Sequence, residues 1–271
     1  MQVIDTIEGF RKALDGARAA GREIGLVPTM GFLHAGHVSL MERAAVECDV
    51  VAASIFVNPL QFAVGEDLSS YPRDLDRDQE LAAAAGVTFL FVPSVAEMYP
   101  EPTLTAVSVA DVSEGMEGSS RPGHFGGVAT VVAKLFNIAG TCRAYFGEKD
   151  WQQLAVVRRM VHDLSFPVEI VACPTVREPD GLAMSSRNAR LSPADREAAT
   201  VISRALFAGR DALESGADPV DARRLVASVI EAEPRAAFDY AEVVDEGARR
   251  RLLAAARFGA VRLIDNVGEA R

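Results

Sequence analysis

The stretch EIGLVPTMGFLHAGHVSLMERAAVECDVVAASIFV, residues 23–57, contains the pattern that decides the fold. Residues 23–29 and 49–57 are short and mostly apolar, which predicts two buried strands. Between them, apolar side chains recur at positions 38, 41, 45 and 48, the spacing of an amphipathic helix. A strand, a helix and a second strand in this order predict a βαβ unit whose two strands are parallel.

The same alternation continues to about residue 176. Helix-like and strand-like runs follow one another at 77–86, 87–93, 125–140, 143–148, 150–164 and 168–176. The pattern predicts an α/β domain over residues 1–175, with a doubly wound, Rossmann-like and mostly parallel sheet. In such a domain we expect the ligand crevice at the carboxyl ends of the strands.

The pattern changes beyond residue 176. Residues 192–216 are predicted to form one helix that ends at a glycine, with Ser192 as its N-cap and Pro193 at its first position. Asp218 and Pro219 begin another helix in the same way, and two strand-like runs follow at 238–245 and 260–267. We therefore expect a second, smaller α+β domain at residues 176–271, which would act as a lid on the first.

Charge and composition exclude several classes of partner. The net charge of −10 argues against binding to nucleic acid or to anionic membranes. No apolar run approaches the ~20 residues that span a bilayer, and acidic residues stand where a signal peptide would be apolar. Cys48, Cys142 and Cys173 are odd in number and lack the C-x-x-C spacing, so a cytoplasmic location is expected.

Two of the four histidines, His34 and His37, lie three residues apart in the turn between the first predicted strand and its helix. Gly31 and Gly36 allow the backbone to approach a ligand closely there. A helix N-terminus favours phosphate, and the two imidazoles add donors. Phosphate binding and an ordinary surface loop explain this turn about equally well, whereas no zinc-type spacing accompanies the histidines.

Polar side chains also follow two other predicted strands. Gln61 could orient a hydroxyl or a carboxylate without cancelling its charge, or it could be a solvated loop residue. Lys149 supplies a cation in a glycine turn, and Asp150 could cap the next helix or bind a ribose hydroxyl. Gln153 lies one turn into that helix, where it could face the same crevice as Gln61.

Two loop segments carry further donors. Ser185, Ser186 and Arg187 suit a phosphate tail, because a guanidinium offers a planar fork of N–H groups, but they also fit a plain interdomain linker. Arg121 and His124 lie in a glycine-rich segment that could be a lid or a flexible loop. Taken together, these signals place donors at several strand ends, where a sheet of this type gathers its ligand.

The motifs resemble those of the pantothenate synthetases (pantoate–β-alanine ligases), a family of the nucleotidyltransferase superfamily. The superfamily's H-x-G-H signature stands at residues 34–37. The family's blocks PTMG, NPxQF, YPR, RPGHFxGV, FGEKD and PTVRExDGLAMSSRN all occur in order, over about residues 20–195. The resemblance implies that ATP, (R)-pantoate and β-alanine give pantothenate, AMP and diphosphate through a pantoyl adenylate, in a homodimeric enzyme.

The resemblance also assigns residues. His37 is implied as proton donor, with His34, Lys149 and Arg187 as further catalytic groups. The family's ATP site corresponds to Met30, Gly31, Phe32, Leu33, His34, Ala35, Gly36, His37, Gly147, Glu148, Lys149, Asp150, Val176, Met184, Ser185, Ser186 and Arg187.

The acceptor and metal sites are implied in the same way. Gln61 and Gln153 correspond to the pantoate site, and Gln61 also borders the β-alanine site. Asp78 matches an aspartate near Mg²⁺, although Arg77 stands where some members have an acid. The ATP phosphates and water are then expected to hold most of the magnesium shell.

Two other functions remain open on the residues alone. A nucleotidyltransferase that leaves the adenylyl group on its product would share the His34/His37 turn, but it would be expected to bind an acceptor phosphate with cations. A nucleotide-sensing module would bind ATP and release no pyrophosphate.

Overall fold

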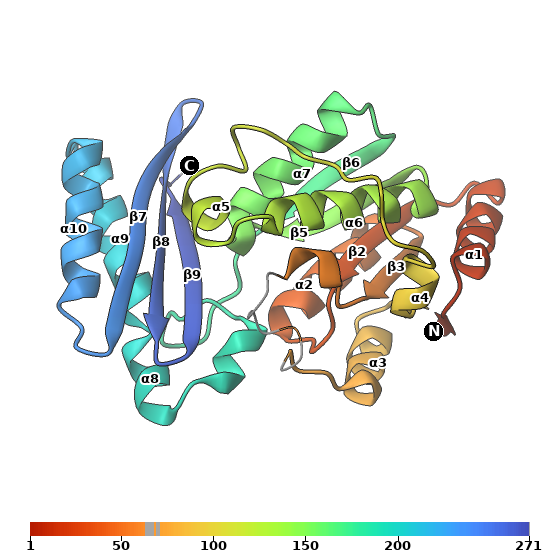
Figure 1. Cartoon of the computed structure of the whole chain (residues 1–271), viewed down its shortest axis with the longest axis horizontal. Coiled ribbons are helices and arrows are strands. Elements are labelled where there is room, and N and C mark those ends of the chain that lie inside the picture. The colour runs from red at the N-terminus through yellow and green to blue at the C-terminus, as the bar shows by residue number, and fades with distance from the viewer. Residues whose placement is uncertain (63–67, 69–70, 271) are drawn as a thin grey trace. The chain divides into compact units, whose positions relative to one another are not determined.

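The computed structural model describes residues 1–62, 68 and 71–270 (Figure 1). Its contacts divide these residues into two compact units. The first consists of Met1–Gly147 and Trp151–Pro174, and the second of Glu148–Asp150 and Thr175–Arg271. The short turn at 148–150 therefore packs with the second unit, although the chain on either side of it belongs to the first.

The first unit is built on a six-stranded parallel sheet in the order β1-β4-β3-β2-β5-β6. The strands are β1 (Gln2–Ile4), β2 (Ile24–Thr29), β3 (Val50–Ile55), β4 (Phe89–Phe91), β5 (Cys142–Gly147) and β6 (Val168–Cys173). The chain builds outward from β2 through β3 and β4, then crosses to β5 and β6 on the other side. The predicted doubly wound sheet is confirmed, and its switch point lies between β2 and β5.

Helices cover both faces of this sheet because successive strand residues point to opposite sides. Leu26 packs into a core shared with α1 (Ile7–Ala19), α6 (His124–Ala139) and α7 (Trp151–Asp163). The next residue, Val27, packs with α2 (Ala35–Glu47) and α3 (Leu75–Ala84). Both faces of β2 are thus buried, which explains its continuous apolar sequence.

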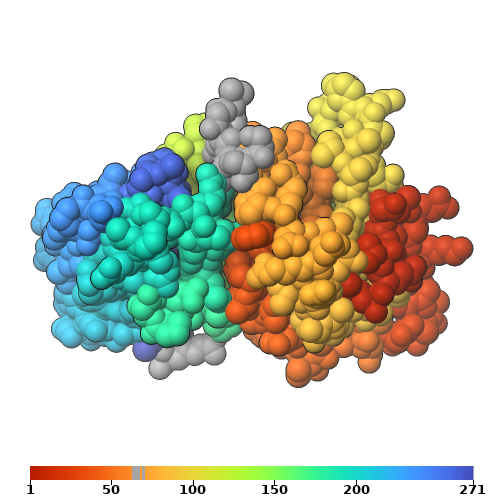
Figure 2. All heavy atoms as spheres, turned by 90° about the horizontal axis from the view of Figure 1, so that it is seen from below, coloured from red at the N-terminus to blue at the C-terminus, as the bar shows by residue number. Residues whose placement is uncertain are grey.

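Shorter elements connect these helices and strands. They are η1 (Pro59–Gln61), α4 (Val95–Met98) and α5 (Met116–Ser120). Between α4 and α5, residues 100–106 are exposed and form the yellow projection in Figure 2. Across the described residues, no helix has both the length and the apolar character needed to cross a membrane.

The second unit contains an antiparallel sheet in the order β7-β8-β9. The strands are β7 (Ala236–Glu246), β8 (Arg249–Phe258) and β9 (Val261–Gly268), and they pack with α9 (Val201–Glu214) and α10 (Pro219–Glu231). The unit also includes η2 (Glu148–Asp150), η3 (Ser186–Arg190) and α8 (Pro193–Ala198). The predicted α+β character of the C-terminal part is confirmed.

The structure corrects two predictions in this unit. The single helix expected at 192–216 is divided into α8 and α9. At the break, the Thr200 hydroxyl donates to the Glu197 carbonyl and the Ser203 hydroxyl donates to the Thr200 carbonyl, so side chains compete with the regular helical hydrogen bonds. Strand β8 was not predicted, because its alanines favour helix and only pairing with both neighbours makes it a strand.

Candidate active site

The loop between β2 and α2 is held in shape by the carboxylate of Asp78. Gly31 and Phe32 have φ angles of 82° and 51°, in the left-handed region. The Asp78 carboxylate accepts the backbone N–H groups of Phe32 at 2.7 Å and Leu33 at 2.6 Å. A Cβ atom on Gly31 would lie 2.9 Å from a methyl carbon of Ile55 and 3.0 Å from Asp78. The turn therefore depends on a glycine at position 31 and on an acceptor at position 78.

Asp78 is almost fully buried, with 1% of its surface exposed. Burial raises the pKa of this carboxyl, and the hydrogen bonds from Leu33 and Phe32 oppose that rise. No cluster of three or more potential metal ligands occurs among the described residues. Asp78 as a magnesium ligand stays a prediction, and its geometry favours a role in shaping the loop.

The rings of His34 and His37 are in contact at the start of α2, with centroids 4.1 Å apart and ring planes tilted by 36°. The Nδ1 atom of His34 accepts the N–H of Gly36 at 3.1 Å, and Nδ1 of His37 accepts the N–H of His34 at 3.4 Å. A neutral imidazole that accepts at Nδ1 carries its proton on Nε2. Each ring is therefore held in the tautomer whose Nε2–H can donate.

Several backbone amides of this turn already have acceptors inside the protein. Phe32 and Leu33 donate to Asp78, Gly36 donates to His34, and the N–H of His37 donates to the His34 carbonyl at 2.8 Å. A helix N-terminus is expected to offer its free amides to phosphate, but these amides already donate to groups inside the protein. These four amides are therefore satisfied inside the protein.

Gln61 lies in η1, beyond the end of β3, and only 7% of its surface is exposed. Its Nε2 atom donates to the sulfur of Met30 at 3.0 Å, and its Oε1 atom accepts from Nδ2 of Asn58 at 3.2 Å. The alternative of a solvated loop glutamine is therefore wrong for this residue. The PTMG motif at the end of β2 and the NPLQF motif after β3 meet at this contact.

Helix α6 packs directly onto the backbone of η1. The carbonyl of Gly127 accepts from Nδ2 of Asn58 at 3.1 Å. A Cβ atom on Gly127 would lie 2.2 Å from the Leu60 carbonyl oxygen and 2.6 Å from the Cα of Gln61. Only a glycine allows the helix to come this close, so Gly127 fixes the position of Gln61.

His124 and Arg121 support Gln61 from the RPGHF motif. Nδ1 of His124 lies 2.9 Å from the Gln61 carbonyl oxygen, which can only accept, so this nitrogen carries the proton. Nε2 of His124 then accepts from Arg121 at 3.0 Å. Both residues are tied to η1, and the motif does not form a detached loop.

Sequence reasoning missed two polar residues that hold this region together, the partly buried Tyr99 and the buried Gln152. The Tyr99 hydroxyl donates to Oδ1 of Asn58 at 2.9 Å, and burial raises its pKa to about 12, so it stays protonated. Gln152 donates to the carbonyls of Val112 and Glu114 and accepts the N–H of Glu117. The signal for Gln152 was its place on the inward, apolar face of α7.

Gln153, the predicted pantoate ligand, is the next residue along α7. It is half-buried, whereas Gln152 is 3% exposed. The two glutamines therefore differ in accessibility: Gln152 is engaged in packing, and Gln153 keeps a surface that a ligand can reach.

The second unit gathers the other predicted ATP-binding residues around β9, which contacts both η2 and η3. In η2, the Lys149 ammonium lies 3.2 Å from the Asp150 carboxylate. The N–H of Met184 donates to the Val176 carbonyl at 3.0 Å, so residues 176–184 fold back on themselves. Ser185 then caps η3, where its hydroxyl accepts the N–H of Arg187 at 3.2 Å.

The predicted ATP-binding residues are therefore divided between the two units. Met30–His37 and Gly147 belong to the first unit. Glu148–Asp150, Val176 and Met184–Arg187 belong to the second.

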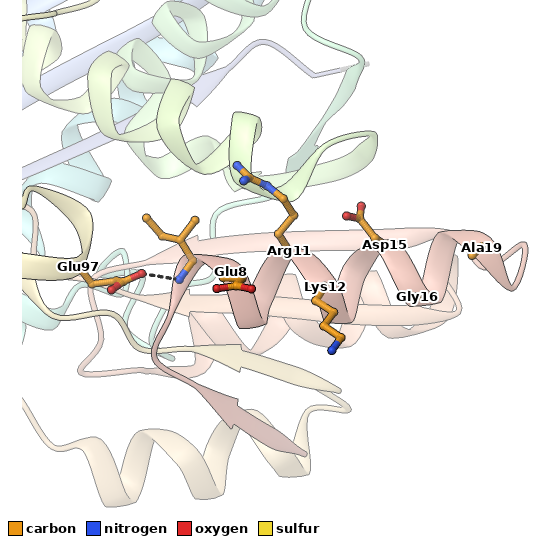
Figure 3. A pocket seen from close by; sticks show the side chains of 8 residues that line it. Glu8, Arg11, Lys12, Asp15, Gly16, Ala19 and Glu97 are labelled. Carbon is orange, nitrogen blue, oxygen red and sulfur yellow. Dashed lines mark hydrogen bonds between the residues drawn. The ribbon is translucent and has the colours of Figure 1, made fainter.

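An open hollow of about 820 Å³ lies along α1, away from all of these motifs in sequence (Figure 3). It is lined by Ile7, Glu8, Arg11, Lys12, Asp15, Gly16, Ala19 and Glu97. At one end, the N–H of Ile7 donates to Glu97 at 2.7 Å. Acidic and basic side chains are mixed on its wall, and it contains none of the predicted site residues, so it is not the candidate active site.

Comparison with known proteins agrees with these motifs. Residues 2–268 match the family model described as pantoate-beta-alanine ligase. The chain is 53% identical to the pantothenate synthetase of Heliobacterium modesticaldum, over 98% of this chain and 99% of that protein. It is 50% identical to the pantothenate synthetase of Rhizobium meliloti, over 98% of this chain and 95% of that protein.

Solved structures give the same result. The crystal structure of pantothenate synthetase from Thermus thermophilus matches with a TM-score of 0.93 at 50% identity, covering 98% of this chain and 99% of that one. Pantoate-beta-alanine ligase from Francisella tularensis, complexed with beta-gamma ATP and beta-alanine, matches with a TM-score of 0.87 at 37% identity, covering 98% and 97%. The chain belongs to the pantoate–β-alanine ligase family.

Proposed function

We propose that this chain condenses (R)-pantoate with β-alanine at the expense of ATP, giving pantothenate, AMP and diphosphate. A carboxylate oxygen of pantoate attacks the α-phosphorus of ATP and diphosphate leaves, which forms pantoyl adenylate. The amine of β-alanine then attacks the acyl carbon of this mixed anhydride, and AMP leaves. Family membership supports the reaction, as does the Francisella relative, whose structure is described as a complex with β-alanine and an ATP compound.

In the first step the protein acts mainly by positioning and by stabilising charge, because phosphoryl transfer needs no protein nucleophile. His37 donates a proton or a hydrogen bond from Nε2 as negative charge develops on the leaving diphosphate, and His34 assists it. Lys149 and Arg187 supply fixed positive charge. The hydroxyls of Ser185 and Ser186 hold phosphate oxygens.

The acceptor pocket is formed by neutral amides. Gln61 and Gln153 bind pantoate, and Gln61 also borders β-alanine. A cation on the attacking carboxylate would stabilise the ground state and weaken the nucleophile, whereas an amide orients it without neutralising it. The observation that supports this proposal best is the contact of buried Gln61 with Met30, since it joins the acceptor residue to the nucleotide loop.

Magnesium enters with ATP in this proposal. When bound, it would neutralise charge on the phosphates, which is its usual role when few protein ligands are present. Asp78 contributes through the shape of the loop that it holds.

Isotope exchange between ATP and pyrophosphate tests the adenylate path. Exchange should require pantoate and should proceed without β-alanine, because reversal of the first step with labelled pyrophosphate regenerates ATP. Exchange only in the presence of all three substrates would show that no free-standing adenylate forms. Pyrophosphate release in the absence of pantoate, with a different acceptor, would favour a nucleotidyltransferase of another specificity, and ATP binding with no release would favour a sensor.

We further propose a homodimer in the cytoplasm. The exposed segment 100–106 includes Leu104, which is 96% exposed, so a second copy that covered it would bury apolar surface. Sedimentation of the purified chain should give the mass of a dimer, and Leu104→Asp should shift the distribution toward the monomer.

A further inference from the structure

Strand β9 contains two adjacent polar residues, Asp265 and Asn266, that are buried in a mostly apolar sequence. They are 4% and 3% exposed. Buried polar groups are costly unless they are hydrogen-bonded, so a pair of them in the middle of a strand calls for partners. Neither residue belongs to the site that the sequence motifs define.

Asn266 holds the turn that carries Lys149. Its Nδ2 atom donates to the carbonyls of Glu148 and Lys149, both at 2.8 Å, and its Oδ1 atom accepts from Arg251 at 2.7 Å. Both amide hydrogens are therefore spent on the backbone of η2. These bonds join η2 to the second unit although β5 and α7, which flank it in the chain, belong to the first.

Asp265 holds the other nucleotide-binding segment. Its carboxylate accepts two bonds from the Arg177 guanidinium, at 2.6 and 2.9 Å. The Arg177 guanidinium also donates to the Gly181 carbonyl at 3.0 Å, and the backbone of Arg177 forms an antiparallel β-bridge with that of Ala183. Arg177 thus fastens the folded segment 176–184, which leads directly into Ser185–Arg187.

We infer that Asp265 and Asn266 are positioning residues for adenylate formation, because one dipeptide of β9 fixes both nucleotide-binding segments of the second unit. This inference rests on the proposed role of Lys149. A lysine side chain has a long flexible stem, so its ammonium can be placed only as well as its backbone is held. A misplacement of about 1 Å can cost roughly 10²-fold in rate.

Asn266→Asp tests the inference because it keeps the shape of the side chain. An aspartate retains an acceptor for Arg251 but turns both donors into an oxygen that faces two carbonyl oxygens. We expect pantoate-dependent ATP–pyrophosphate exchange to slow about 10- to 100-fold. In a Lys149→Ala background the same change should have little further effect, since the displaced group is already gone.

Leu263→Ala is the matched control. Leu263 is a buried residue of the same strand that packs into the apolar core of the second unit. The Leu263→Ala substitution should lower the melting temperature. At temperatures where the variant is folded, its rate of ATP–pyrophosphate exchange should stay close to that of wild type. The inference would be overturned if Asn266→Asp slowed ATP–pyrophosphate exchange by the same factor in wild type and in Lys149→Ala. It would also be overturned if Leu263→Ala slowed this exchange as much as Asn266→Asp does.

Backbone hydrogen exchange separates this inference from the proposed function. Amide hydrogens of residues 148–150 should exchange faster in Asn266→Asp than in wild type or in Leu263→Ala. This result does not depend on catalysis. If the wild-type protein showed no pantoate-dependent ATP–pyrophosphate exchange, only the proposed function would be refuted. Unchanged amide exchange in the turn would refute the positioning role alone.

Discussion

At the scale of single residues, Asp78 shows how a side chain can act on a substrate site without touching the substrate. Its carboxylate takes two backbone hydrogens from a loop whose Gly31 and Phe32 lie in the left-handed region. The strain of a non-glycine residue with positive φ persists only when its surroundings hold it. The His34/His37 pair follows directly, so its placement depends on this clamp.

Asp78→Asn should impair the loop, because the new amide can accept only one of the two N–H groups and turns a donor toward the other. Each lost hydrogen bond to a charged acceptor costs about 1.5–3 kcal/mol. We expect a higher KM for ATP and a lower kcat, measured by steady-state kinetics. Asp76→Asn, exposed on the same first turn of α3, should behave like wild type.

Magnesium titration distinguishes the clamp from a metal ligand. If Asp78 shapes the loop, the activity lost in Asp78→Asn stays lost at high magnesium concentration. Recovery of wild-type rates with added magnesium would instead assign Asp78 to the metal.

At the scale of elements, α6 and η1 are in contact through backbone atoms. Gly127→Ala would place a methyl group 2.2 Å from the Leu60 carbonyl oxygen, so η1 has to move and Gln61 with it. We expect the KM for pantoate to rise more than tenfold, an effect of about 1.4 kcal/mol, and the KM for ATP to change less. Steady-state kinetics with each substrate varied in turn measures both values.

Gly126→Ala is the control for this change. The nearest atom to a Cβ at Gly126 is a carbonyl oxygen 3.9 Å away, so the methyl group fits. Both substitutions gain the same helix propensity, about 1 kcal/mol per glycine replaced, and differ only in the clash. Equal KM values for pantoate in the two variants would show that the approach of α6 does not set the acceptor pocket.

Elements were also the level at which prediction from sequence succeeded or failed. Periodicity was enough to predict the βαβ pattern of the first unit, since both faces of β2 and β3 are buried. It did not predict β8, whose Ala254, Ala255 and Ala256 become strand residues only between β7 and β9. Nor could it show that Gln61 is buried, because the approach of α6 at Gly127 is a tertiary contact.

At the scale of the whole molecule, stability should depend on pH through Glu47, which links α2 to the sheet. Its carboxylate accepts from Arg43 at 2.8 Å and from the Tyr145 hydroxyl at 2.9 Å. The hydrogen bond from Arg43, helped by that from Tyr145, holds the pKa of Glu47 below its usual 4.5. The stabilisation that Glu47 contributes is therefore fully present above pH 4.5. It is lost as the pH falls through the lower pKa that Glu47 has in the folded protein.

Glu47→Gln should lower the free energy of unfolding by about 1 kcal/mol at pH 7. The difference from wild type should shrink as the pH falls from 4.5 through the lower pKa of Glu47 in the folded protein. Urea unfolding at several pH values measures it. Glu42→Gln, exposed on the same helix, should follow the wild-type curve throughout. A constant offset between Glu47→Gln and wild type at all pH values would contradict the linkage.

The Asp78 carboxylate has a consequence for how a nucleotide binds. It occupies the amides of Phe32 and Leu33 as an internal anion, so the turn has its bent conformation before any phosphate arrives. Ordering a flexible loop on binding would cost conformational entropy for each residue fixed. In this protein the loop is already ordered in the folded state by its hydrogen bonds to Asp78. The affinity of this turn for a nucleotide is therefore free of an ordering penalty, and association need not wait for the loop to find its shape.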